Sequence, residues 1–429
     1  MWALLILAVL VATASVVPAA LALAVFGGAA FAALLALDVT LGPSRTSLRV
    51  SRAPAEFVAL RRPGRLRYRV ENRAPLGIRL GILESPVETF VFERESLEAD
   101  VAARTSVELE LGFEARERGL ARLRAIYVWV ENRIGLLRRR YAADAPEEVR
   151  VFPDFSAIEH YGTLARRSTL LEAGLRKLRL RGAGAEFESL REYFPGDAFR
   201  SINWKATARR GRIMVEQHEI ERSQQVLILL DAGRLMMPRI GPQRKFDYAL
   251  TAGLSVARIA QTAGDNVGLV AFAAKPVLSI APRRGAAHVN ALARAAYDLQ
   301  PRLEEPDYET TFTDLKRRYG KRSLVVLFTD IFDPAASAAV LGGLATRVPR
   351  HLVMCVLMND AAIAESLAAP VGAPREAYRT SVGMILSDER QKAIATLRAL
   401  GIIVIDVPAP QLTVALLDAY LDVKARGLL

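Results

Sequence analysis

Carboxylates and arginines are densely mixed in the segment Glu186–Arg210 of this 429-residue chain, and these side chains could do chemistry. Glu186, Glu192 and Asp197 are candidates for a paired general acid and general base, which many hydrolases build from two carboxylates. Arginines accompany them in similar number, so ion pairing is the role that we expect instead. The segment therefore predicts a charged surface rather than a reaction centre.

Aromatic residues are interleaved with these charges, namely Phe187, Tyr193, Phe194, Phe199 and Trp204. A solvated loop does not need such aromatic residues, and a core strand could not tolerate so much charge. We therefore expect an ordered, ion-paired segment, in which Tyr193 and Trp204 pack onto a neighbouring sheet rather than stack on a ligand. The side chains that we expect to contact a partner protein are Glu186, Arg191, Tyr193, Asp197, Arg200, Trp204, Lys205 and Arg209.

Two further carboxylates, Asp231 and Asp330, follow apolar runs that are typical of buried strands. Asp231 comes directly after Val226–Leu230, and Asp330 comes directly after Ser323–Thr329. Parallel strands of an α/β sheet end at one edge, and ligands bind at that edge. The two aspartates are therefore candidates for a site at the carboxyl edge of a sheet.

Other common catalytic motifs are absent from the sequence. The four histidines are scattered and lack the helical spacing of metal ligands, and no Gly-rich phosphate-binding loop is present. Cys355 is the only cysteine, and it lies in an apolar run that predicts a buried strand. We accordingly expect no catalytic residue and no cofactor.

Strands and helices that alternate along the sequence must position these side chains. From Gln225 onward, apolar strand segments alternate with helical segments, which predicts an α/β fold with a doubly wound, mostly parallel sheet. Asn266–Ala273 and Pro276–Ile280 are too close for a helical crossover, so we expect them to form an antiparallel edge hairpin. Between Ser47 and Asp154, apolar and polar residues alternate without a helical period, which predicts a small antiparallel β-sandwich.

The N-terminal stretch Trp2–Leu37 contains no charged side chain. It has the length of two short membrane spans of roughly 17–25 residues each, and Pro18 is the natural break between them. Arginines follow directly, so we expect a multi-pass protein of the inner membrane whose soluble domains are cytoplasmic. A cleaved signal peptide is the alternative, but no Lys or Arg precedes the apolar run.

These patterns together predict the domain organisation. We expect two transmembrane helices in residues 1–40, a β-sandwich in 46–154, a basic linker with the charged segment in 155–224, and the α/β domain in 225–429. The formal net charge is +12, which could attract nucleic acid, anionic lipid or an acidic protein. No nucleic-acid-binding motif is present, so we do not expect nucleic acid as a partner.

The charged segment also resembles a known family. The matching motifs are Glu186-Phe187, Leu190-Arg191-Glu192-Tyr193, Pro195-Gly196-Asp197, Arg200, Asn203-Trp204-Lys205 and Ala208-Arg209. They resemble the signature of domain-of-unknown-function family 58, membrane proteins with a von Willebrand factor A-like domain that are commonly associated with MoxR-type AAA+ ATPases. The resemblance implies an A-like α/β domain preceded by a β domain and a membrane hairpin. It also implies an ATPase of the MoxR type as a partner.

The resemblance permits a test for a metal site. A-like domains that bind a divalent metal use an Asp-x-Ser-x-Ser motif, with a Thr and an Asp on later loops. Asp231 matches the first position, but Gly233 and Leu235 stand where the serines would be, and neither offers a side-chain oxygen. The remaining candidate ligands are Thr310 or Thr311, and Asp330. We expect a degenerate site at Asp231, Thr311 and Asp330 that binds Mg²⁺ weakly or not at all.

An internal cation is a further hypothesis for this site, because Arg234 could pair with Asp231 or Asp330. Together these expectations describe a membrane-anchored, cytoplasm-facing adaptor without enzymatic activity. Its partner would be a MoxR-type AAA+ ATPase that acts in chaperone-like assembly or maturation. The alternative is an envelope-associated hydrolase that uses the carboxylates of Glu186–Asp197. A third possibility, a binder of anionic surfaces or nucleic acid, predicts steep salt dependence.

Overall fold

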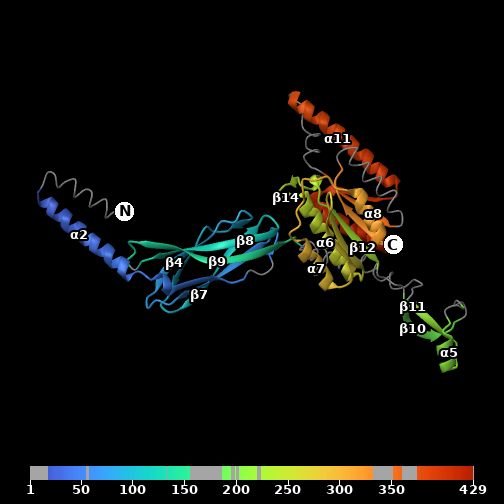
Figure 1. The fold of residues 1–429 in the computed structure, drawn as a ribbon, viewed down its shortest axis with the longest axis horizontal. Coiled ribbons are helices and arrows are strands. Elements are labelled where there is room, and N and C mark those ends of the chain that lie inside the picture. Colours follow the sequence, from blue (N-terminus) through green and yellow to red (C-terminus); the bar gives the residue numbers. More distant parts are fainter. Residues whose placement is uncertain are drawn as a thin grey trace. The chain divides into compact units, whose positions relative to one another are not determined.

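The computed structural model describes residues 18–54, 58–132, 134–154, 186–194, 199, 202–219, 224–331, 351–359 and 374–428. The chain divides into two compact units, Met1–Phe152 and Pro153–Leu429 (Figure 1). The first unit has one apolar core. The described residues of the second unit form a six-stranded sheet with a core on each face and two separate two-stranded sheets. Residues 155–185, which belong to the predicted linker and charged segment at 155–224, lie outside the described residues, and so does the first predicted membrane span, Trp2–Val17.

The first unit contains two β-sheets. One has the order β1-β3-β7-β5 and is antiparallel, with strands β1 (Leu48–Arg52), β3 (Pro63–Asn72), β7 (Ser106–Ala115) and β5 (Phe90–Phe92). The other has the order β2-β9-β8-β4-β6, with strands β2 (Val58–Ala59), β9 (Arg138–Phe152), β8 (Gly119–Glu131), β4 (Ile78–Glu84) and β6 (Leu97–Val101). Its long strands pair antiparallel, and the short β2 runs parallel to β9.

Alternation of apolar and polar residues explains why these strands form. In β3, Leu66, Tyr68 and Val70 are fully buried, and the arginines between them are exposed. Successive side chains of a strand point to opposite faces, so one face of each sheet can line a common core. Residues of both sheets form a single apolar cluster, which makes the N-terminal region an antiparallel, β-rich unit.

One helix, α2 (Pro18–Leu41), precedes these sheets. Its Asp38 is completely buried, and the carboxylate accepts hydrogen bonds from the backbone N–H groups of Ile134 (2.8 Å) and Leu137 (2.9 Å). The side-chain amide of Asn132 donates to the Asp38 carbonyl at 3.1 Å. The end of α2 is thus fixed to the loop between β8 and β9.

The predicted fold class requires correction. A von Willebrand A-like sheet preceded by a β-sandwich and a transmembrane helical hairpin was expected, but the second expected span, Ala19–Leu37, is part of a helix that continues through the buried Asp38 to Leu41. Among the residues that the structure describes, no helix is long and apolar enough to cross a membrane. The structure supports a mixed α/β chain with an antiparallel, β-rich N-terminal region.

The second unit begins with a small module that contains two strands and one helix. β10 (Glu186–Glu192) pairs antiparallel with β11 (Met214–Glu219), and α5 (Trp204–Arg210) lies between them in the sequence. The side chain of Asn203 caps α5 by accepting a hydrogen bond from Ala206 N at 2.8 Å. Gly211, with φ of 65°, ends the helix in the left-handed conformation that glycine adopts without strain.

A six-stranded sheet forms the body of the second unit, in the order β16-β15-β12-β17-β18-β19. Its strands are β12 (Gln225–Asp231), β15 (Asn266–Phe272), β16 (Pro276–Arg283), β17 (Leu324–Phe328), β18 (Leu352–Asn359) and β19 (Ile403–Pro408). β16 pairs antiparallel with β15, and the other neighbours pair parallel. A short hairpin, β13 (Arg239–Ile240) and β14 (Gln243–Arg244), precedes the first helix of this sheet.

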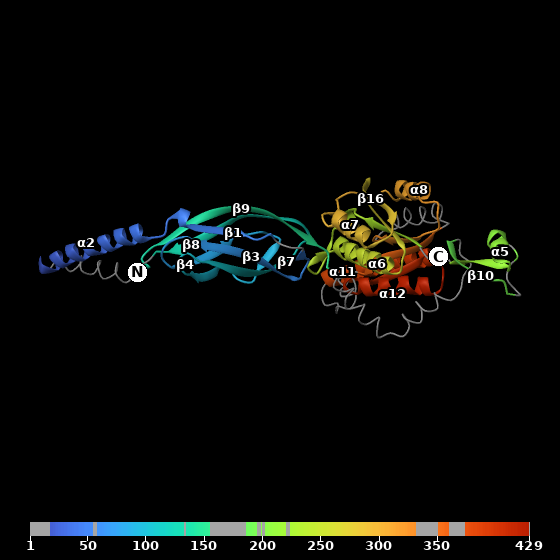
Figure 2. The same cartoon turned by 90° about the horizontal axis from the view of Figure 1, so that it is seen from below.

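Helices cover both faces of this sheet (Figure 2). Alternate residues of β12 face a core that contains α6 (Lys245–Thr262), α7 (Ala286–Ala296) and α12 (Leu412–Ala425). The residues between them face a second core with α8 (Tyr308–Arg318) and α11 (Pro374–Ala399). Coverage on both faces explains the continuous apolar runs of the parallel strands. The carboxyl ends of the parallel strands lie at one edge of the sheet, and Asp231, Asp330 and Asp406 are found there.

Candidate functional site

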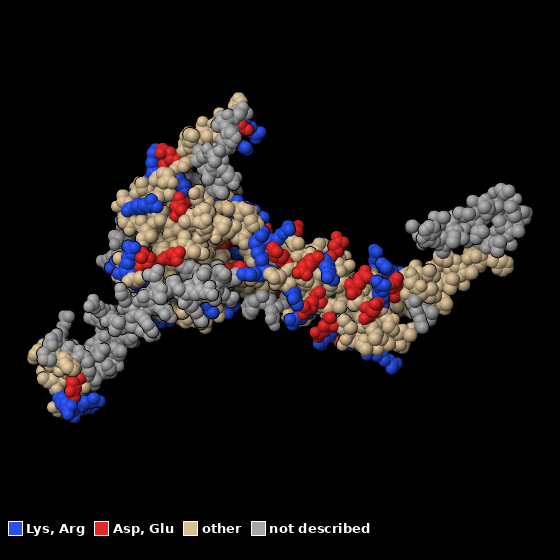
Figure 3. All heavy atoms as spheres, turned by 180° about the vertical axis from the view of Figure 1, so that it is seen from behind, with Lys and Arg blue, Asp and Glu red and all other residues tan. Residues whose placement is uncertain are grey.

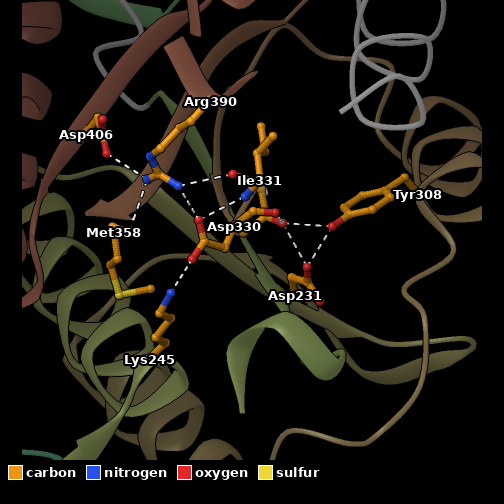
Figure 4. Close-up of polar contacts among 9 residues, drawn as sticks. Asp231, Lys245, Tyr308, Asp330, Ile331, Met358, Arg390 and Asp406 are labelled. Atoms are coloured by element: carbon orange, nitrogen blue, oxygen red, sulfur yellow. Dashed lines mark hydrogen bonds and ion pairs between the residues drawn. The ribbon is translucent and has the colours of Figure 1, made fainter. Parts of the chain in front are cut away.

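Asp231 ends the central strand β12 and is completely buried. Its carboxylate accepts hydrogen bonds from Gly233 N (2.7 Å), the Tyr308 hydroxyl (2.7 Å) and the Thr329 hydroxyl (2.8 Å), as Figure 4 shows for Tyr308. Burial raises the pKa of Asp231 above its usual range, although these hydrogen bonds oppose that change. Burial also raises the pKa of Tyr308 well above its ordinary value. The arrangement is a closed polar cluster in which the tyrosine remains a proton donor.

The raised pKa of Asp231 predicts a pH dependence of stability. Because the pKa of an unfolded aspartate is about 3.9, the folded state binds this proton more tightly than the unfolded state does. The stabilisation is complete below about pH 3.9 and is lost as the pH rises through the folded-state pKa. Asp231→Asn keeps a neutral side chain, so we expect its stability relative to the wild type to increase as the pH rises above about 4, the pKa of the unfolded aspartate. Urea denaturation over a range of pH from about 4 upward measures this gain.

The control for that experiment is Asp388→Asn, which changes a carboxylate that is 64% exposed. We expect no comparable gain for this variant as the pH rises. A stability difference between Asp231→Asn and the wild type that stays constant over the same range would contradict the prediction.

Asp330, which follows β17, is held by two cations from different helices (Figure 4). Lys245 Nζ donates to Asp330 Oδ2 at 2.6 Å, and Arg390 Nη1 donates to Oδ1 at 2.7 Å. The side chains of Lys245 and Asp330 are both 0% exposed. Arg390 also binds Asp406 at 2.7 Å and the carbonyl oxygen of Met358 at 3.1 Å. The charges of these four side chains are therefore paired with one another.

The position of Lys245 is unusual for a cation. It is the first residue of α6, and a positive charge at a helix N-terminus is opposed by the helix dipole. A buried ammonium also loses its hydration, which is costly without a partner. Asp330 compensates both effects, so the pairing explains why lysine is tolerated at this position.

Thr311, the predicted hydroxyl ligand, does not join this cluster. α8 begins at Tyr308 after the cap residue Asp307, so Thr311 lies within the helix, and its hydroxyl donates to the Asp307 carbonyl at 2.7 Å. Tyr308 contacts Asp231 instead. Asp231 and Asp330 thus lie at the same edge of the sheet, whereas the Thr311 hydroxyl is hydrogen-bonded within α8 and its cap. Among the described residues, no group of three or more His, Cys, Asp or Glu side chains is arranged to hold a metal ion.

The space beside Asp231 is filled by the loop at residues 302–306. A Cβ atom on Gly233 would lie 2.8 Å from Pro306 Cδ, 2.9 Å from the Glu304 carbonyl oxygen and 3.0 Å from Asp231 Oδ1. A serine at this position would therefore require the loop to move. Arg234, the hypothetical internal cation, pairs with Glu305, whereas Lys245 and Arg390 are the cations at Asp330.

The predicted protein-binding residues lie in or next to the β10–α5–β11 module, except that Asp197 and Arg200 are outside the described residues. Glu186 and Arg191 belong to β10, and Tyr193 follows it with its side chain half-buried. Trp204, Lys205 and Arg209 are on α5 and are exposed. Glu192 pairs with Arg212 at 2.7 Å.

Sequence reasoning missed Lys245, Tyr308 and Arg390 as members of the cluster at the sheet edge. Lysine in the first turn of a helix, against the dipole, was the one signal that could have identified a buried partner. Tyr308 and Arg390 carry no such signal, because each contributes to the cluster only through the tertiary fold.

Comparison with known proteins gives distant relatives. Uncharacterized proteins of Mycobacterium tuberculosis (strain H37Rv) and Mycobacterium bovis are each 23% identical over 181 residues. The match covers 42% of this chain and 56% of the length of those relatives.

Among solved structures, BatB from Bacteroides thetaiotaomicron, a conserved hypothetical protein, aligns with a TM-score of 0.31 and 9% identity, over 47% of this chain and 99% of BatB. The PapD-like domain 7 of human CEP192 aligns with a TM-score of 0.21 and 10% identity, over 26% of this chain and 89% of that domain. Scores of this size do not establish a shared fold. Residues 189–368 match the sequence profile of the family described as "Protein of unknown function DUF58", which confirms the family resemblance for this segment.

Proposed function

We propose that this chain is an adaptor without enzymatic activity, which presents the β10–α5–β11 module to a partner protein. The observation that carries the proposal is the contrast between two sets of charged groups. At the sheet edge, Asp231 and Asp330 are buried and bound by donors of the protein itself. On the module, the charged Lys205 is exposed, and so is its neighbour in the sequence, Trp204, at 62%.

The partner that we propose is a MoxR-type AAA+ ATPase, acting in chaperone-like assembly or maturation of other proteins. Support comes from the family resemblance of the motifs between Glu186 and Arg209, together with the DUF58 match at residues 189–368. The expected inner-membrane localisation and the expected degenerate site, which binds Mg²⁺ weakly or not at all, stay predictions.

Co-purification tests this partnership. We expect a MoxR-type ATPase to elute with an affinity-tagged full-length chain from cells of the native host, as identified by mass spectrometry. Trp204→Ala should reduce the recovered ATPase, because exposed tryptophans anchor many protein interfaces. Tyr378→Ala is a matched control, since Tyr378 is 71% exposed on α11, away from the module in the sequence. Recovery of no AAA+ protein above the level of an untagged control would contradict the proposal.

A further inference from the structure

Three exposed cations on α5 have no acidic partner among the described residues. They are Lys205, Arg209 and Arg210, and Figure 3 shows Lys and Arg side chains gathered at one end of the module. Lys205 and Arg209 are four residues apart and therefore share one side of the helix. Arg212, by contrast, is neutralised by Glu192. The helix thus presents positive charge that no described carboxylate neutralises.

Three large aromatic side chains of the same module are also exposed. Phe194 is 66% exposed, Phe199 is 73% exposed and Trp204 is 62% exposed. The rings of Phe199 and Trp204 lie 6.5 Å apart between centroids, which is within the range of aromatic pairs. Folded monomers usually bury such residues, and a cluster of exposed ones marks an interaction surface.

An ordered scaffold holds these side chains in place. Ile202, Met214 and Val215 are buried, and the backbone N–H of Met214 donates to the Thr207 hydroxyl at 3.0 Å. The Asn203 cap fixes the start of α5. The exposed aromatic residues are therefore attached to a small core of their own, which makes them available to a partner.

We propose that this basic–aromatic patch, defined as Phe194, Phe199, Trp204, Lys205, Arg209 and Arg210, binds an acidic protein segment that also carries apolar side chains. The inference rests on the proposed function, because it names the chemistry of the partner. Opposite charge steers association, and buried aromatic anchors supply affinity. Single-stranded nucleic acid needs a basic groove that follows its backbone, whereas these cations are confined to one short helix.

Fluorescence anisotropy of the full chain with defined peptides tests the inference. The probe is a labelled peptide of about 20 residues, a length that matches one side of a standard interface, composed of Glu, Asp, Leu and Phe. A matched peptide contains Gln and Asn in place of the acids. We expect the acidic peptide to bind and the neutral peptide to bind at least about tenfold more weakly. The variant K205E/R209E/R210E should lose at least about tenfold in affinity for the acidic peptide, and W204A should also weaken it.

The matched control is R258E/R294E/K316E, which makes the same charge change on exposed positions of α6, α7 and α8. It should retain affinity within about twofold, and circular dichroism spectra establish that each variant folds. Absent binding of the acidic peptide to the wild type would overturn the inference. Equal losses of peptide affinity in the patch and control variants would also overturn it. The same holds if a single-stranded dT oligonucleotide or phosphatidylglycerol vesicles bind more tightly than the acidic peptide does.

The two proposals fail separately. If the acidic peptide binds but no AAA+ protein co-purifies, the ATPase partnership is contradicted and the inference about the patch stands. If the acidic peptide does not bind but the ATPase co-purifies, the inference about the patch is contradicted and the ATPase partnership stands.

Discussion

Replacing Asp330 by asparagine is expected to lower the free energy of unfolding of the α/β unit by about 3–5 kcal/mol. The substitution leaves the fully buried Lys245 ammonium without its carboxylate and removes one of the two carboxylates bound by Arg390. An uncompensated buried charge is strongly destabilising, because the cost of dehydration is no longer offset. Urea denaturation followed by the helical circular dichroism signal measures the loss, since the helices α6, α8, α11 and α12 belong to this unit.

A control and a double variant isolate the cause of this loss. Asp388→Asn removes a carboxylate that is 64% exposed and pairs with Lys392, so it should cost less than about 1 kcal/mol. Lys245→Met combined with Asp330→Asn should cost less than the sum of the two single variants, because the charges are removed together. A loss in Asp330→Asn as small as that in the control would contradict the buried network.

Replacing Glu84 by glutamine is expected to destabilise the β-rich unit by about 3 kcal/mol. Glu84 and Arg52 have side chains that are each 1% exposed and form an ion pair of 2.7 Å. The Tyr68 hydroxyl donates to the same carboxylate at 2.6 Å, and burial raises the pKa of Tyr68 above its ordinary value. Glutamine removes the nearer of two carboxylates that pair with Arg52, because the other, Glu147, is 3.5 Å away. Hydrogen exchange of the amides of β3, β4 and β8, resolved by mass spectrometry, follows this unit alone.

The matched control is Glu110→Gln on β7 of the same unit. Glu110 also pairs with arginines, Arg65 and Arg67, but it is 41% exposed. We expect this change to cost less than about 1 kcal/mol, because solvent screens the pair. Equal acceleration of exchange in both variants would show that burial does not determine the strength of the Glu84 contacts.

Local sequence patterns could locate the two edge aspartates. The continuous apolar runs before Asp231 and Asp330 are typical of strands covered on both faces, and β12 and β17 lie there. The alternation between Ser47 and Asp154 likewise agrees with strands such as β3 and β7. These signals are local, because each depends on the two faces of a single strand.

Long-range pairs could not be predicted in the same way. Lys245 and Asp330 are 85 residues apart, and Arg390 and Asp330 are 60 residues apart, so no local period relates them. Tyr308 was missed because it lies 77 residues from Asp231 in the sequence, and only the tertiary fold brings the start of α8 next to that carboxylate. At the N-terminus, apolar composition favoured two membrane spans, but composition does not show how Asp38 is bound.

Asp330 joins helices that lie on opposite faces of the sheet. Lys245 comes from α6 on one face, and Arg390 comes from α11 on the other. One carboxylate at the rim therefore connects a helix of one layer with a helix of the other. A mechanical pull on α11 would reach α6 directly through these charges, without first deforming the tightly packed interior.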